Sequence, residues 1–197
     1  MSPTRGRGRM SAVLRWTSSD LERLPDIEGV RYEIIDGELH VAKAPGWHHQ
    51  YTCDGIVMAL RGWDRHTGVG VTVSGPGLIF PSDENVIPDV VWIRRERLAA
   101  ALDEAGHLRQ APELVVEVLS PGRANEVRDL ELKLELYSRQ GVHEYWVVDG
   151  SGRTVRVYRR EQATLQLVTT LGGDDVLTTP LLLGFACPLG SLWESPV

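Results

Sequence analysis

Two acidic residues stand inside the two most apolar segments of the chain. Asp89 interrupts the β-branched segment "VIPDVVWI" (86–93), and Glu117 interrupts "PELVVEVLS" (112–120). An unpaired charge in a buried strand is costly, so each carboxylate needs a partner. Carboxylate oxygens are the ligands that Mg²⁺ and Mn²⁺ prefer. One cation shared by both acids would therefore explain the two interruptions together.

Whether the two acids meet depends on the strands that carry them. Side chains alternate across a strand, so Asp89 shares a face with Val91, and Glu117 shares a face with Val115. If the strands are neighbours, the carboxylates converge on one point, where they repel each other unless a cation or a proton lies between them. The alternatives for each acid are a strand end that water reaches or an ordinary salt bridge, with Arg94, Arg95 and Arg128 as candidate partners.

A helix predicted over 124–140 carries a third candidate, Lys133. The apolar stripe of this helix, with steps of three and four residues, consists of Val127, Leu130, Leu134 and Tyr137. Lys133 lies beside the stripe, so its flexible stem could bring the ammonium group to the two acids, where it would orient a water or neutralise phosphate charge. The same spacing fits a solvated face on which Asp129 and Lys133 pair at i, i+4. Both interpretations stay open at this point.

Glu33 is a candidate for a further metal ligand. It belongs to "RYEIIDGELHVA" (31–42), in which Asp36-Gly37 between two strand-like segments predicts a β-hairpin. Alternation places Glu33 on the same face as Ile35, so it would point inward. The alternative is a hairpin with solvated ends.

His49 is a candidate for an auxiliary role. It lies four residues before Cys53 on the buried side of a helix predicted over 48–64, where it would contact substrate or support a metal ligand. The alternative is a histidine that is simply satisfied near a helix start. His48, His49 and Cys53 also have a transition-metal spacing, but no second cluster accompanies them, so a zinc site is disfavoured.

The elements that position these residues form an α/β (mixed α+β) pattern. The N-terminal hairpin is followed by the helix over 48–64 and by the two apolar strands. A further strand at "EYWVVD" (144–149) leads into a C-terminal β-meander over 153–170. We predict a flexible basic tail over 1–15 and a single domain over 16–197, with a mixed central sheet flanked by helices.

Composition narrows the class of protein. The chain has 197 residues, a net charge of −6 and 42% hydrophobic residues, and it contains no apolar segment of membrane-spanning length. The start lacks the apolar core of a signal peptide, so a cytoplasmic location without membrane association is expected. The two cysteines have no paired spacing, which argues against a disulfide framework. The acidic balance disfavours a broad nucleic-acid-coating face but is compatible with a phosphodiester-cleaving site.

Four segments of the chain together resemble a known family. In order along the chain they are "YEIIDGELHVA", "PDVVWI", "PELVVEVLSP" and "KLELYSRQGVHEYWVVD". They resemble the Uma family of restriction-endonuclease-like proteins, a widespread bacterial group within the PD-(D/E)XK nuclease superfamily. The resemblance covers about residues 16–193. It implies a restriction-endonuclease-like core and hydrolysis of DNA phosphodiester bonds.

The resemblance also implies roles for individual residues. Pro88-Asp89 matches the "PD" half of the motif and Glu117 matches the acid of the "(D/E)XK" half, with Mg²⁺ (or Mn²⁺) held by Asp89, Glu117 and the backbone carbonyl of Val118. Leu119 stands where the pattern expects lysine. The lysine role therefore either moves to Lys133 or is lost.

The sequence leaves alternatives open for the activity and for the assembly of the protein. Loss of the lysine role would leave a catalytically inactive module that binds nucleic acid or protein. The apolar C-terminal segment "PLLLGFACPLGSLW" (180–193) either closes the core or joins a second copy in a homodimer.

Overall fold

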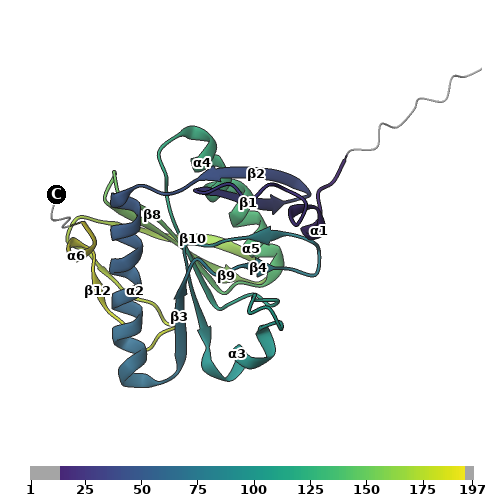
Figure 1. The fold of residues 1–197 in the computed structure, drawn as a ribbon. Helices are drawn as coiled ribbons and strands as arrows, with labels where there is room; N and C mark the ends of the chain where they lie inside the picture. The colour runs from purple at the N-terminus through teal and green to yellow at the C-terminus, as the bar shows by residue number, and fades with distance from the viewer. Residues whose placement is uncertain (1–13, 194–197) are drawn as a thin grey trace, which may run out of the picture.

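A six-stranded sheet forms the centre of the computed structural model, which describes residues 14–193 (Figure 1). β7 and β8 run parallel, and the other neighbouring strands are antiparallel. In spatial order the strands are β10 (Thr164–Gly172), β9 (Thr154–Glu161), β8 (Glu144–Asp149), β7 (Leu114–Val118), β6 (Val90–Arg94) and β3 (Gly70–Ser74). The predicted mixed sheet and C-terminal meander are confirmed. The predicted tail lies outside the described residues except for Leu14 and Arg15.

Two apolar layers cover the two faces of this sheet, because side chains alternate along each strand. Val90 and Trp92 belong to one core cluster, which packs under α2 (Trp47–Thr67). Val91 and Ile93 belong to the other. The helical segment that covers this second face consists of α4 (Arg123–Val127), η1 (Arg128–Leu132) and α5 (Lys133–Gln140). Figure 1 shows α2 on the side of the sheet away from α4 and α5.

The predicted hairpin is confirmed and belongs to a second, four-stranded sheet. Asp36 and Gly37 both have positive φ angles, 54° and 75°, which is the geometry of a tight two-residue hairpin turn. Ile35 is buried in the second core cluster, so the hairpin is anchored to the same face that α5 covers. The strands of this sheet, in spatial order, are β2 (Glu38–Lys43), β1 (Val30–Ile35), β5 (Asn85–Val86) and β4 (Leu78–Ile79).

The predicted continuous strand over 86–93 is wrong, because the segment is broken before Asp89. β5 ends at Val86 and β6 begins at Val90. Pro88 between them has no N–H to donate and is poorly suited to a central strand. Asp89 therefore occupies a bend immediately before β6 and not the middle of a strand.

The predicted helix over 124–140 is present but contains a π-helical turn, η1. The buried line on this helix includes Asp129, Lys133 and Tyr137, whereas Val127 of the predicted stripe is half-buried. A π turn adds a residue to the repeat and so rotates the positions that follow it. Lys133 is 2% exposed, which excludes the interpretation that it lies on a solvated face.

The remaining short elements complete the fold. The C-terminal segment packs into the core with α2, and its buried residues are Leu182, Phe185, Cys187, Leu189 and Leu192. These side chains thus close the core. Among residues 14–193, no helix combines the length and apolarity that a membrane crossing requires. The other elements are α1 (Ser18–Leu21), α3 (Arg95–Ala101), β11 (Val176–Leu177), β12 (Cys187–Pro188) and α6 (Gly190–Trp193).

Gly70 should be essential to the packing of β3 on β6. A Cβ atom there would overlap the indole of Trp92, which is fully buried and donates a hydrogen bond to Asp64. We expect Gly70→Ala to lower the free energy of unfolding by about 1–3 kcal/mol, because the indole cannot move aside. Urea unfolding measures this change. Gly62→Ala is the control, since a Cβ on Gly62 would meet no atom within 4 Å. Equal stability of the Gly70 variant and the parent would contradict the prediction.

Candidate active site

Asp89 and Glu117 come together where β6 and β7 pair. Val90 of β6 lies opposite Val116 of β7, so Asp89, one residue before β6, lies opposite Glu117. The Val118 backbone N–H donates a hydrogen bond of 2.8 Å to Asp89 Oδ2. His49 Nε2, from the first turn of α2, lies 3.2 Å from the same oxygen. The bend at Asp89 is thereby tied to the strand that carries Glu117.

Lys133 joins this pair of acids to Glu33. Its Nζ lies 2.9 Å from Glu117 Oε1 and 2.9 Å from Glu33 Oε1. The Tyr137 hydroxyl, one helical turn farther along α5, donates a hydrogen bond of 2.8 Å to Glu117 Oε1. Glu33 Oε1 also accepts a hydrogen bond of 2.8 Å from the Ile87 N–H. The ammonium group is therefore fixed between two buried carboxylates from different sheets.

Arg128 and Asp129 form a second ion pair beside the first. The guanidinium of Arg128 donates two hydrogen bonds to Asp129, of 2.9 and 3.2 Å. Asp129 Oδ1 lies 4.0 Å from Lys133 Nζ, and Arg128 Nε lies 4.0 Å from Glu33 Oε2. The cluster thus contains three buried acids, the partly buried Asp89 and two permanent cations. Negative charge is in excess.

Burial and this excess charge perturb the titration of the cluster. Burial raises the pKa of Glu117 to about 8, with the neighbouring carboxylates adding to the effect and Lys133 opposing it. Burial would lower the pKa of Lys133, but the charges of Glu117 and Glu33 outweigh it and raise that pKa. Asp89 differs from Glu117: burial opposes its ionisation, yet His49 and the Val118 N–H hold its pKa below the usual value. A carboxyl group with a raised pKa gains most from a nearby cation.

The donor set fits a hard divalent cation. Asp89, Glu117 and Val118 line a cavity of about 40 Å³, together with Lys133 and His49. Within the described part of the chain, Asp89 Oδ1 and Glu117 Oε2 accept no hydrogen bond, so one oxygen of each carboxylate is available. Oxygen donors of this kind suit Mg²⁺ and Mn²⁺. These residues can hold such an ion and would relieve the excess negative charge by doing so.

His49 also belongs to a softer donor set. His49, Cys53 and Asp89 offer ligand atoms that all lie within 4.8 Å of one another, and Cys53 Sγ lies 3.6 Å from His49 Nδ1. His48 is exposed and does not take part. Cys53 does not line the cavity of about 40 Å³, whereas Asp89, Glu117 and Val118 all do. The carboxylate set is therefore the better fit to a metal in the described cavity.

Three neighbours of the cluster were not identified as site residues from the sequence. Tyr137 was identified only as an apolar stripe residue, and Asp129 only as a surface partner of Lys133. The signal was present, because Asp129, Lys133 and Tyr137 recur every four residues and so share one helix face. Arg128 was considered a partner for Asp89 or Glu117, whereas its hydrogen bonds go to Asp129 and Asn125. Leu119, in place of the expected lysine, packs against the second core cluster.

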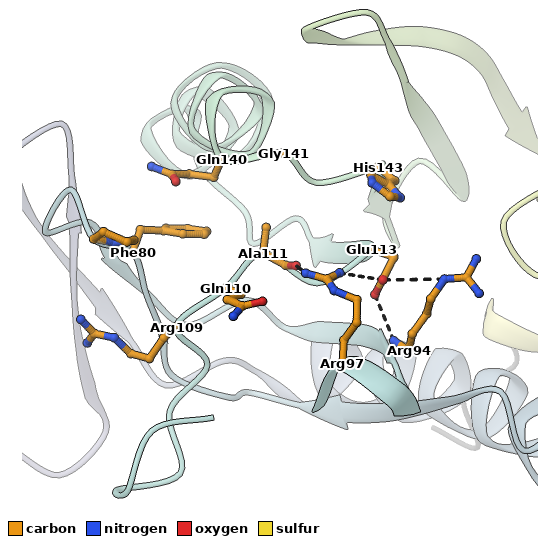
Figure 2. Close-up of a pocket in the computed structure, with 11 residues that line it drawn as sticks. Phe80, Arg94, Arg97, Arg109, Gln110, Ala111, Glu113, Gln140, Gly141 and His143 are labelled. Atoms are coloured by element: carbon orange, nitrogen blue, oxygen red, sulfur yellow. Dashed lines mark hydrogen bonds and ion pairs between the residues drawn. The ribbon is translucent and has the colours of Figure 1, made fainter. Parts of the chain in front are cut away.

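Glu113 is a further buried acid that lies just before β7. Its environment differs from that of Glu117. Figure 2 shows a pocket of about 600 Å³ near the far end of α5, in which the guanidinium of Arg97 donates a 2.6 Å hydrogen bond to Glu113. The Arg94 N–H donates another, of 3.0 Å. Glu113 is thus paired by arginine in the ordinary way, and none of the candidate site residues lines this pocket.

Comparisons with known proteins identify a family and a fold for this chain. The family model Uma2, described as "Putative restriction endonuclease", matches residues 18–190. The chain is also similar to a crystal structure described as "a putative nuclease belonging to DUF820", from Anabaena variabilis, with a TM-score of 0.71. That similarity covers 90% of this chain and 97% of the other at 18% identity, so it shows the fold alone. No curated protein matches the chain.

Proposed function

The chain belongs to the Uma2 family of restriction-endonuclease-like proteins, and from this membership and the site we propose that it is a metal-dependent endonuclease that hydrolyses DNA phosphodiester bonds. The resemblance and the fold class expected from the sequence are both confirmed. The observation that carries the proposal is the convergence of Asp89, Glu117 and Lys133 on one small cavity. Two acids and a lysine in this arrangement are suited to holding a cation and a water beside a phosphate.

Asp89, Glu117 and the backbone carbonyl of Val118 would hold Mg²⁺ or Mn²⁺. When bound, such an ion neutralises charge on the phosphate and lowers the pKa of a water molecule. Val118 also fixes the geometry from the protein side, because its N–H holds Asp89 Oδ2 and leaves Oδ1 for the ion. His49 restrains the same oxygen from α2 and so positions Asp89.

Lys133 takes the role of the lysine that the strand lacks. Its two carboxylate partners keep it positively charged, so it acts as a hydrogen-bond donor and not as a base. In this role it orients the attacking water and stabilises the charge that develops on the phosphate. Glu33 and Tyr137 are positioning residues, because one restrains Lys133 and the other restrains Glu117.

The proposed reaction is an in-line displacement at phosphorus. The water oxygen forms a new bond to phosphorus while the bond to the leaving deoxyribose oxygen breaks. One proton of the water passes to solvent, and the leaving oxygen takes up a proton from solvent. The products are a phosphate monoester and a free hydroxyl group, so the reaction consumes one water and needs no other reactant.

A catalytically inactive module that binds nucleic acid or protein is the second candidate. Leu119 favours it, since a leucine at this position of the strand cannot polarise water. The ion pairs around Lys133 would then have a structural role alone. Such a module has no need for a metal ion, which separates it from the nuclease.

Metal dependence tests the proposal directly. We expect the purified protein to nick supercoiled plasmid in Mg²⁺ or Mn²⁺ and to be inactive in excess EDTA, because the carboxylates need a cation to bring them near phosphate. Isothermal calorimetry should detect Mn²⁺ binding to the parent protein. The absence of both nicking and Mn²⁺ binding would favour the inactive module.

We further propose that residues 16–197 form a single nuclease domain. The protein would be cytoplasmic and would have no membrane partner. Cleavage of both strands of a duplex requires two sites, so a homodimer is the proposed form on duplex DNA. The buried residues of the C-terminal apolar segment close the core of one copy. Leu183 of the same segment is 84% exposed, so it is the candidate dimer contact there.

A further inference from the structure

An aromatic pocket of about 550 Å³ adjoins the candidate active site. It lies between the first two turns of α2, the loop after β7, the turn after β8 and α6. Its aromatic residues are Trp47, Tyr51 and Trp193, and Arg153 and Ser120 add polar groups. None of these side chains has a role in the proposed chemistry.

The aromatic pocket and the metal-binding cavity share a wall. His49, Val118 and Ser120 line both. His49 is also the residue whose Nε2 lies 3.2 Å from Asp89 Oδ2. A ligand in the aromatic pocket would therefore lie next to the position where a phosphodiester bond would be cleaved.

The shape of the pocket depends on two close approaches to α2. Leu192 of α6 packs against Gly55, where a Cβ atom would lie 3.0 Å from a Leu192 methyl group. The turn after β8 approaches Thr52, whose Oγ1 would lie 3.6 Å from a Cβ on Gly150. Leu192 and the turn at Gly150 both pack on α2. Trp47 and Tyr51 therefore face a pocket whose opposite walls are held in place by this packing.

The aromatic residues of this pocket differ in exposure, and Trp47 is the most exposed of them. Trp47 is 62% exposed at the first position of α2, and Tyr51 follows four residues later on the same side of the helix. The indole Nε1 of Trp193 is buried and has no hydrogen-bond partner within the described residues. A buried N–H without a partner is costly, so this donor would gain from a ligand acceptor.

The combination of groups indicates the class of ligand. Aromatic rings bind the flat faces of nucleobases by stacking, and an N–H donor can pair with a ring nitrogen or carbonyl on the base edge. The guanidinium of Arg153 can bind a phosphate in the same chain. A purely apolar ligand would leave both polar groups unused. A duplex keeps its bases stacked and paired, so an aromatic pocket of this kind receives a base that is unpaired.

We propose that the aromatic pocket binds an unpaired nucleobase of a single-stranded nucleic acid and thereby places the adjoining phosphodiester at Asp89 and Glu117. This inference rests on the proposed nuclease function and adds its substrate class. Trp47 and Tyr51 supply the stacking surface, and Arg153 binds a phosphate of the same nucleic-acid chain.

Binding of three matched oligomers in EDTA tests the inference without requiring cleavage. The probes are a thymidine decamer, a decamer of the same charge with abasic sugars, and a blunt ten-base-pair duplex. We expect the parent protein to bind the thymidine decamer about tenfold more tightly than either other probe, because stacking on an aromatic side chain is the main contribution. Trp47→Ala and Tyr51→Leu should each remove this preference, and Trp47→Ala should also remove a fluorescence change on binding.

Met58→Ala is the matched control, since Met58 is 74% exposed on the same helix but does not line the pocket. It should bind all three probes as the parent does. Equal affinity of the parent for the thymidine and abasic decamers, or unchanged binding by folded Trp47→Ala, would overturn the inference. Metal-dependent cleavage of single-stranded DNA by Trp47→Ala at the parent rate would also overturn it while leaving the proposed nuclease intact. Base-dependent binding without any metal-dependent cleavage would instead support the pocket and reject the nuclease.

Discussion

Asp89→Asn and Glu117→Gln should each lower metal-dependent DNA cleavage by about a thousandfold, a loss of about 4 kcal/mol of transition-state stabilisation. Each change keeps the size of the side chain and removes the negative charge that would hold the ion. The amide oxygens that replace the carboxylate oxygens can still accept the hydrogen bonds of the Val118 N–H and of Lys133 and Tyr137, so the fold should persist. Initial rates of plasmid nicking at saturating Mg²⁺ measure the effect.

Glu113→Gln provides the matched control for both variants. Glu113 is another buried acid, just before β7, but its partners are Arg97 and the Arg94 N–H, away from the cavity. Glu113→Gln should leave the cleavage rate within about twofold of the parent rate, because Glu113 contacts no reacting group. If cleavage fell equally in all three variants, a general loss of structure would account for the result. If it fell in none, Asp89 and Glu117 would have no catalytic role.

Lys133→Met should damage both activity and stability. Loss of the ammonium donor is expected to lower cleavage by about a hundredfold to a thousandfold, which is typical when a donor to developing charge is removed. The change also leaves Glu33 and Glu117 buried without their shared cation, so the free energy of unfolding should fall by about 3–5 kcal/mol. Plasmid nicking and urea unfolding measure the two effects separately.

A second substitution separates the catalytic effect from the structural one. Adding Glu33→Gln to Lys133→Met removes one of the two uncompensated charges, so part of the lost stability should return. Cleavage should remain low, because the donor beside Glu117 is still absent. Recovery of cleavage together with stability would assign Lys133 a purely structural role. Undiminished cleavage by Lys133→Met alone would reject the catalytic role, and unchanged urea unfolding would reject the structural one.

Local patterns accounted for most of the fold. The turn at Asp36-Gly37, the nearly continuous apolar strand β7 and the apolar strand β8 are each encoded within a few consecutive residues, and all three are confirmed. The errors arose where two local signals competed. At Pro88 the apolar run favoured a continuous strand, but the missing N–H broke it, and at η1 a single π turn shifted the buried face of an otherwise regular helix.

The site was harder to predict than the fold, because its contacts are not local. Alternation on β7 and β6 indicates that Glu117 and Asp89 share a face, which requires only that the strands be neighbours. The contact between Glu33 and Lys133 depends on how the hairpin sheet packs against α5, and nothing in either segment alone specifies that packing. The sequence consequently left Lys133 with two interpretations, and its burial in the structure distinguishes between them.

The bridge between Glu33 and Glu117 through Lys133 has a consequence for the order of folding. Its members come from the first hairpin, a central strand and the helix after that strand, so Lys133 is the last of the three along the chain. Contacts between segments so far apart in the chain cost loop-closure entropy. They therefore form after the local elements. A partly synthesised chain that ends before α5 would carry its acids without the lysine. If the proposed function holds, a chain that ends before α5 should therefore not cleave nucleic acid, because it lacks the lysine that completes the site.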